Sequence, residues 1–271
     1  MKYRGKQVEV THVIAVLLVI LVSVPIIMPL GLPIKVGDEV KRIYDYIETI
    51  PEGSPVLVSV DITPSGYAET GPTMICMLRQ LFAKNLRVIG VAFLDTGANM
   101  FETALSKVDL TGKTYGEDYV NLGFRAGGEP SITAFAADIL KTIPVDHRGN
   151  KVEGLPVMEG IKTAKDIAFI FSVYSSSPGT EQWIRQVSDP YKIPIAAACG
   201  ASQSSRLVVY VQSKQLVGLA AGLKGGADYE YITNQKGLGL AAMDAQSIVH
   251  LFVIGLIAVG NITYFRDRKK S

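Results

Sequence analysis

Charged, hydroxyl and glycine residues follow each apolar segment that has the pattern of a buried strand. In an open parallel sheet, the carboxyl ends of the strands share one edge and lie beside helix N-termini, where free N–H groups favour an anion. The candidate ligand-binding residues at this edge are Asp61, Asp95, Arg125, Gly127, Gly128, Ser175, Ser176, Ser177 and Gly179.

Two kinds of ligand match these residue types. Arg125 and the turn 175–179 would hold a phosphate or a carboxylate through a guanidinium, hydroxyls and backbone N–H groups. Asp61 and Asp95 would hold a hydrated divalent cation, which prefers oxygen ligands. The other interpretation is that these residues only cap helices, since capping alone requires Ser, Thr, Asp and Gly at strand-to-helix turns. The sequence leaves both interpretations open.

Common signatures of catalysis are missing from the sequence. It contains no G-x-S-x-G, G-x-x-x-x-G-K-[ST] or H-E-x-x-H motif, and no G-x-G-x-x-G at the first strand-to-helix turn. A Ser–His–Asp arrangement would require His147, on a long loop, to reach a strand end. Cys76 and Cys199 lie in apolar segments, where a buried free thiol is usual. We therefore expect no catalytic residue, no metal site and no cofactor.

The middle of the chain alternates apolar strands with helices. The strand segments are 55–62, 86–95, 118–124, 166–174 and 193–199, and the helical segments include 71–84, 128–143 and 180–188. Such strands form a parallel sheet that is covered on both sides. We expect an α/β fold with a Rossmann-like, doubly wound, mostly parallel sheet. Segment 144–160 is expected to be a surface excursion, and 206–212 is ambiguous between strand and helix.

An apolar segment stands near each end of the chain. Val13–Leu30 is long enough to cross a hydrocarbon layer of about 30 Å as a helix, and 244–265 forms a second such segment. The first is longer than a signal-peptide core and no small-residue cleavage site follows it, so we expect an uncleaved anchor.

Basic residues at the two ends predict the orientation. They are Lys2, Arg4 and Lys6 before the first apolar segment, and Arg266, Arg268, Lys269 and Lys270 after the second. The positive-inside tendency places both termini in the cytoplasm and the domain outside it. Lys35, Lys41 and Arg42 oppose this orientation, because they stand on the other side of the first segment.

Segment 36–50 has one apolar helical face, formed by Val36, Val40, Ile43, Ile47 and Ile50. This stripe predicts either a helix that lies on the membrane surface or a helix packed on the edge of the domain. We favour packing on the domain.

Segment 213–232 has the pattern of a helix in which Gly218, Gly222 and Gly226 share one face. Each glycine costs about 1 kcal/mol of helix propensity relative to alanine, so close approach of another backbone must offset the loss. The partner is either the domain's own sheet or a neighbouring subunit. These glycines are the candidate interface residues.

Four phrases resemble those of an uncharacterised group of prokaryotic membrane proteins: YGEDYVNLGF (115–124), SSSPGTEQW (175–183), QLVGLAAGLKGGADYE (215–230) and MDAQSIVHL (243–251). The resemblance covers most of the chain and implies one span at each end of a Rossmann-like domain. It implies no activity and no catalytic residue.

The predicted organisation is a basic tail (1–12), a first transmembrane helix (13–34), a juxtamembrane amphipathic helix (35–53), the α/β domain (54–232), a linker (233–243), a second transmembrane helix (244–265) and a basic tail (266–271). With a net charge of +2, the chain has no basic field that would bind nucleic acid.

Two functions match this organisation. The first is a membrane-anchored, non-enzymatic domain that acts as a scaffold, sensor or binding module. Its partners would be the lipid bilayer and either further copies of itself or another membrane protein. The second is a membrane-bound enzyme, or a nucleotide- or anion-binding protein, that holds a small anionic ligand at the strand ends. We expect the first.

Overall fold

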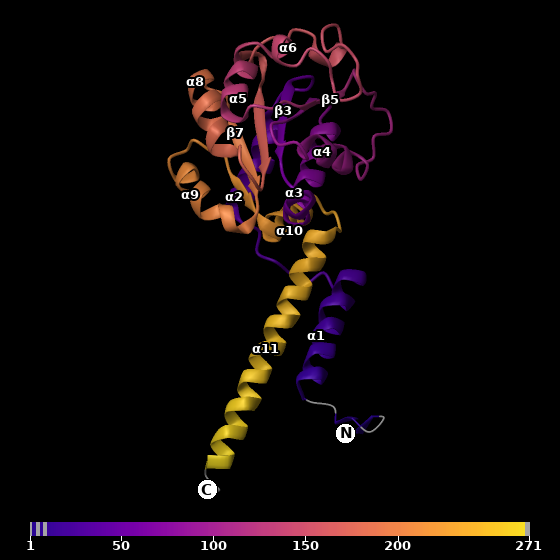
Figure 1. Ribbon diagram of the computed structural model, residues 1–271, viewed down its shortest axis with the longest axis vertical. Coiled ribbons are helices and arrows are strands. Elements are labelled where there is room, and N and C mark those ends of the chain that lie inside the picture. The colour runs from indigo at the N-terminus through magenta and orange to yellow at the C-terminus, as the bar shows by residue number, and fades with distance from the viewer. Residues whose placement is uncertain (1, 4–5, 8–9, 269–271) are drawn as a thin grey trace.

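Six parallel strands form the centre of the computed structural model, which describes residues 2–3, 6–7 and 10–268 (Figure 1). In chain order they are β3 (Pro55–Asp61), β4 (Arg87–Ala92), β5 (Tyr119–Phe124), β6 (Phe169–Tyr174), β7 (Ile195–Cys199) and β8 (Leu219–Ala221). Across the sheet their order is β5-β4-β3-β6-β7-β8. The chain builds the sheet from β3 to one edge and then from β6 to the other, which is the doubly wound order. The predicted α/β fold with a parallel sheet is confirmed.

Helices cover both faces of this sheet. One face carries α2 (Asp38–Thr49), α3 (Pro64–Ala83), α4 (Gly97–Leu105) and α10 (Gly222–Ile232). The other carries α5 (Gly128–Ala137), α6 (Ile139–Thr142), α7 (Thr180–Trp183), the π-helical turn η3 (Ile184–Ser188), α8 (Asp189–Tyr191) and α9 (Ser204–Gln212). Successive side chains of a strand point to opposite faces, so Val56 and Val58 of β3 join the first core and Leu57 joins the second.

The single helix predicted over 213–232 is wrong. Residues 219–221 form β8, which pairs with the edge of β7, and α10 starts only at Gly222. Gly222 has a φ of +56°, a left-handed conformation that glycine adopts at low cost and that separates the strand from the helix. The ambiguous segment 206–212 belongs to a helix, α9.

Gly218, Gly222 and Gly226 therefore do not share a helical face. A Cβ at Gly218 would lie 2.2 Å from the backbone oxygen of Glu39 in α2, and one at Gly226 would lie 2.8 Å from Cβ of Pro72 in α3. These glycines allow elements of the same chain to approach each other. The backbones that approach Gly218 and Gly226 belong to helices of the domain rather than to its sheet, which was the partner predicted within the chain.

The apolar stripe of α2 packs into the domain. Val40, Ile43 and Ile47 are buried, with exposed fractions of 3%, 0% and 0%, in the core beneath α3 and α10. The predicted amphipathic helix is thus an edge helix of the domain, as favoured above, and its apolar face is not available to a membrane.

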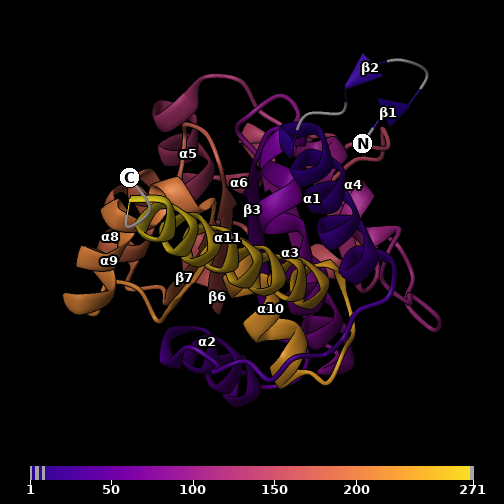
Figure 2. The same cartoon turned by 90° about the horizontal axis from the view of Figure 1, so that it is seen from below.

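Two apolar helices, α1 (Val10–Ile27) and α11 (Leu238–Arg268), lie side by side and project away from the domain (Figure 1). Both are long and apolar enough to cross a membrane. Figure 2 shows α11 leaving the domain beside α3 and α10. Residues 2–3 and 6–7 form a short antiparallel pair, β1 (Lys2–Tyr3) with β2 (Lys6–Gln7). Of the basic residues used to predict orientation, Arg4, Lys269 and Lys270 lie outside the described residues.

The linker predicted over 233–243 is shorter than expected, because α11 already begins at residue 238. The cause is Glu230 of α10, whose carboxylate accepts the free N–H groups at the start of α11. Gly239 donates to Oε1 at 3.0 Å and Leu240 to Oε2 at 2.7 Å. A carboxylate stabilises a helix N-terminus by satisfying its unpaired donors and by its charge.

Two further carboxylates fix the connector between α1 and α2. Asp244 of α11 is buried and accepts the backbone N–H groups of three successive residues, 30 to 32, at 2.8, 2.9 and 3.0 Å. Asp228 of α10 accepts the N–H of Gly37 at 3.1 Å and pairs with Lys224. Both terminal helices are therefore held to the domain by hydrogen bonds rather than by free linkers.

Replacing Asp244 with alanine is expected to release the connector after α1. Three hydrogen bonds to a charged acceptor are lost, so the connector should open locally about tenfold or more often. Limited trypsin cleavage after Lys35 in the detergent-purified chain measures this opening. Asp109→Ala is the matched control, since Asp109 is exposed and caps only its own turn through Thr111. Equal cleavage rates in the two variants would contradict the proposed role of Asp244.

Candidate functional site

A cavity of about 360 Å³ opens at the carboxyl edge of the sheet, between the segments that follow β6 and β7. It lies next to the pair β3–β6, where the strand order reverses. This reversal is the point at which doubly wound sheets bind ligands. We call it the switch-point cavity. Its lining residues are Tyr174, Ser175, Ser176, Ser177, Gly179, Glu181, Gln182, Gln203 and Arg206.

The turn after β6 is tied to the turn after β3. The backbone N–H of Ser175 donates to the carbonyl of Asp61 at 3.1 Å, and Ser175 Oγ accepts the N–H of Thr63 at 3.1 Å. Gly66 allows this contact, because a Cβ there would lie 2.0 Å from Ser175 Oγ. The serine turn 175–177 is therefore positioned by backbone hydrogen bonds to the neighbouring strand end.

The opposite wall of the cavity comes from the segment after β7. Gln203 donates through Nε2 to the carbonyl of Ser175 at 3.3 Å. Arg206 lies in the first turn of α9, and no hydrogen bond or ion pair to another described residue occupies its guanidinium. It therefore supplies an exposed positive charge beside three serine hydroxyls.

Sequence reasoning missed Arg206, and the reason is the ambiguity of segment 206–212. If segment 206–212 were the next parallel strand, Arg206 would begin that strand and lie at the amino-terminal edge of the sheet. Because the segment is instead a helix that follows β7, Arg206 stays at the carboxyl edge. The serines at 204 and 205 were the available signal, since serine is common at helix starts.

Tyr174 forms the floor of the switch-point cavity. Its hydroxyl is buried and has no hydrogen-bond partner among the described residues. Burial, and then the negative charge of Glu181, raise the pKa of Tyr174, so the phenol keeps its proton at neutral pH. Gly179 lies against this ring, since a Cβ there would be 2.4 Å from Cδ2 of Tyr174. The phenol is therefore protonated, and its enclosed oxygen is influenced by Glu181, which also lines the cavity.

Asp61 is a buried structural residue and is not a ligand-binding residue of the cavity. Its Oδ1 accepts the N–H groups of Phe93 at 2.6 Å and Leu94 at 2.9 Å, and its Oδ2 accepts the hydroxyl of Ser59 at 2.7 Å. Because both oxygens are used and the side chain is fully buried, Asp61 does not present oxygens to a hydrated cation. Asp95 is exposed and accepts the N–H of Thr96, next to it in the chain.

Arg125 lies apart from the serine turn. It is exposed at the end of the edge strand β5 and lines a different cavity, of about 400 Å³, together with His147. Gly127 and Gly128 have φ values of +119° and +59° and form the turn into α5. The structure thus brings together Ser175, Ser176, Ser177 and Gly179 in one cavity. Asp61 adjoins this turn through its backbone but is buried, and Arg125 lines a different cavity.

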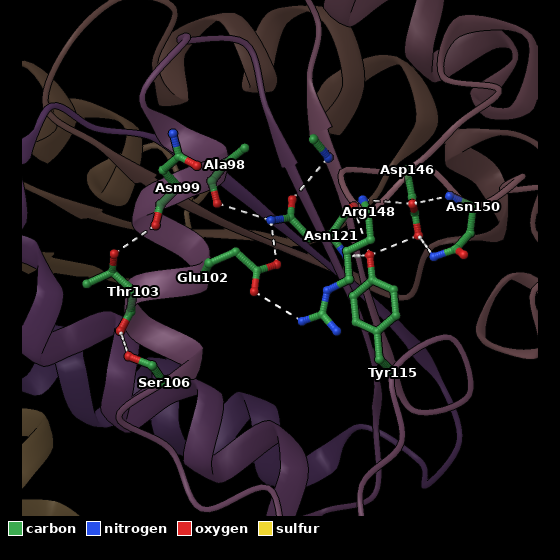
Figure 3. A network of polar contacts seen from close by, with 11 residues as sticks. Ala98, Asn99, Glu102, Thr103, Ser106, Tyr115, Asn121, Asp146, Arg148 and Asn150 are labelled. Atoms are coloured by element: carbon green, nitrogen blue, oxygen red, sulfur yellow. Dashed lines mark hydrogen bonds and ion pairs between the residues drawn. The ribbon is translucent and has the colours of Figure 1, made fainter.

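A polar network fixes the excursion 144–160 to the edge strand β5 (Figure 3). Asn121 of β5 donates to Glu102 Oε1 at 2.9 Å, and Glu102 Oε2 accepts from Arg148 at 3.1 Å. The guanidinium carbon of Arg148 lies 3.6 Å from the centre of the Tyr115 ring, whose hydroxyl donates to Asp146 at 2.9 Å. The excursion is therefore anchored at its start rather than loosely attached.

Chemically, the switch-point cavity is suited to binding an anion. It offers a guanidinium, hydroxyls and an amide as donors, with Glu181 as one acceptor. Neither histidine nor cysteine is among the described residues that line it, and the hydroxyl of Ser175 accepts a backbone N–H.

Comparison with protein-family models, with curated proteins and with solved structures found no match to this chain.

Replacing Asp61 with asparagine is expected to remove a pH dependence of stability. Burial raises the pKa of Asp61 to about 6, although the donors from Ser59, Phe93 and Leu94 lower it. An unfolded chain releases this proton near pH 4. Between these values the folded state binds more protons, so the free energy of unfolding falls with rising pH, by on the order of 3 kcal/mol.

Urea unfolding of the detergent-purified wild type and of Asp61→Asn from pH 4 to pH 7 measures this effect. Asparagine retains an acceptor for the two N–H groups and does not titrate. The variant should therefore become more stable relative to the wild type as pH rises to 6, and then keep a constant difference. A difference that does not change with pH would contradict the assignment to Asp61.

Replacing Asn121 with alanine is expected to destabilise the edge of the sheet. Asn121 is fully buried, and its loss leaves the N–H of Gly123 and part of Glu102 without partners. Such a loss costs about 2–3 kcal/mol and should lower the melting temperature by about 5–10 °C. Asn99→Ala on the exposed side of α4 is the control and should change it little. Similar melting temperatures for the two variants would show that the network contributes little.

Proposed function

We propose that this protein is a membrane-anchored, non-enzymatic binding module that holds a small anionic ligand in the switch-point cavity. The observation that carries the proposal is the position of Arg206 beside the serine turn 175–177, at the carboxyl edge of the sheet next to the strand pair where the order reverses. An arginine with additional hydroxyl donors binds a phosphate or a carboxylate by charge-assisted hydrogen bonds. The ligand is therefore a molecule that carries one of these groups.

Anchorage by α1 and α11 is the second part of the proposal. The two helices contact each other and leave the same side of the domain, and α11 extends beyond α1 (Figure 1). Their outer ends, which carry the termini of the chain, both lie far from the domain. Two spans of this arrangement put both termini on one side of a membrane and the domain on the other. The basic residues at the outer ends, among them Arg266 and Arg268, favour the cytoplasm for the termini.

Ligand binding accounts for the structure better than a scaffold built on glycine contacts. Gly218, Gly222 and Gly226 are used in contacts within the chain, so they no longer support an interface between subunits. The cavity, in contrast, contains the guanidinium of Arg206, which no hydrogen bond or ion pair to another described residue occupies.

Replacing Arg206 with alanine is expected to abolish anion binding. The detergent-purified chain is screened by thermal shift against inorganic phosphate, nucleoside phosphates, sugar phosphates and small carboxylates. An anion that stabilises the wild type should bind about 10- to 100-fold more weakly to Arg206→Ala, because a charge-assisted contact contributes about 1.5–3 kcal/mol. Arg125→Ala is the matched control, since Arg125 is also an exposed arginine at a strand end but lines the other cavity.

Two results would refute the binding site. One is a screen in which no anion raises the melting temperature of the wild type. The other is an anion whose effect is lost in Arg125→Ala and kept in Arg206→Ala, which would move the site to the edge of the sheet.

A further inference from the structure

Two adjoining cavities lie at the junction between the domain and α11. One, of about 270 Å³, lies between α3 and the turn 233–237 that precedes α11. The other, of about 440 Å³, lies between this turn and the connector after α1. Glu230 and Lys236 line both, and neither cavity shares a residue with the switch-point cavity. We call these two the junction cavities.

The walls of the junction cavities are largely apolar. Side chains from the domain and from both terminal helices or their connectors contribute, among them Pro72, Ile75, Leu238, Leu32 and Leu240. Tyr67 lines the first cavity, and its buried hydroxyl has no hydrogen-bond partner among the described residues. An apolar chain with polar atoms near one end matches such a lining.

Positive charge surrounds the first junction cavity. Arg79 of α3 is held in place, because its guanidinium donates to the side chain of Gln235 and, at 2.9 Å, to the carbonyl of Lys107. Lys107 and Lys236 also line this cavity, and no carboxylate of the described residues pairs with either ammonium.

Glu230 is the acidic residue of the junction cavities. Its two oxygens accept the N–H groups of Gly239 and Leu240 at the start of α11, and its charge also acts on Arg79. Three cations and one carboxylate therefore line the first cavity, so its charge stays positive beside the apolar wall.

We propose that the junction cavities bind an anionic phospholipid, with its phosphate at Arg79, Lys107 and Lys236 and the start of an acyl chain in the apolar interior. The inference rests on the membrane anchorage proposed above, because anchorage by α1 and α11 places the turn 233–237 at headgroup level. Lysine and arginine side chains at this level attract anionic lipids. The switch-point cavity, with Arg206, shares no lining residue with the junction cavities and is a separate site.

Replacing both Lys107 and Lys236 with alanine is expected to remove a preference for anionic lipid. The full chain in mild detergent is titrated with phosphatidylglycerol or phosphatidylcholine of the same acyl chains, and bound lipid is counted by native mass spectrometry. The wild type should bind phosphatidylglycerol at least about tenfold more tightly than phosphatidylcholine, and the double variant should lose about tenfold of this preference. Lys141→Ala with Lys165→Ala is the matched control, because these exposed lysines line neither cavity.

Equal affinity of the wild type for the two lipids, or an unchanged preference in Lys107→Ala/Lys236→Ala, would overturn the proposal. Competition by soluble glycerol 3-phosphate at the lipid's own concentration would also overturn it, by showing a site for a free phosphate. If the membrane anchorage itself is wrong, the result is different: the wild-type chain is recovered in the soluble fraction without detergent. Arg206→Ala should keep the lipid preference, so failure of the switch-point site is recognised separately.

Discussion

Buried carboxylates that accept backbone N–H groups hold this protein together where its parts meet. Asp61 joins the end of β3 to the turn after β4, Glu230 of α10 fixes the start of α11, and Asp244 of α11 holds the connector after α1. Each of these acids satisfies at least two donors that would otherwise be buried or unpaired, and a donor left in that state costs about 1–3 kcal/mol. The arrangement of domain and terminal helices depends on these bonds.

The geometry of the strand ends follows from the same constraint. Since Asp61 is used inside the sheet, the polar groups that line the cavity come from the segments after β6 and β7. Small residues allow the turns to approach closely, as Gly66 does at Ser175. The result is a cavity that places the guanidinium of Arg206 beside the serine turn.

The junction with α11 shows how one segment serves two purposes. The turn 233–237 ends α10 and leads into α11 through the carboxylate of Glu230, and the same turn places Lys236 and Gln235 beside Arg79. The hydrogen bonds that make this connection rigid also fix the cations around an apolar cavity. A ligand at the junction would therefore contact the domain and the base of α11 at once.

The sequence by itself determined the α/β class, five of the six strands and the two long apolar helices, because strand apolarity and segment length are local properties of the chain. It also placed the serine turn 175–177 at a strand end. Tertiary structure alone decided that residues 219–221 pair with β7 and that Arg206 rather than Arg125 shares a cavity with the serines. It also decided that Gly218 lies against α2, Gly222 against Ala201 in the turn after β7, and Gly226 against α3. These outcomes depend on which strands are neighbours and on how closely backbones approach, and such non-local distances leave no periodic signal in the sequence.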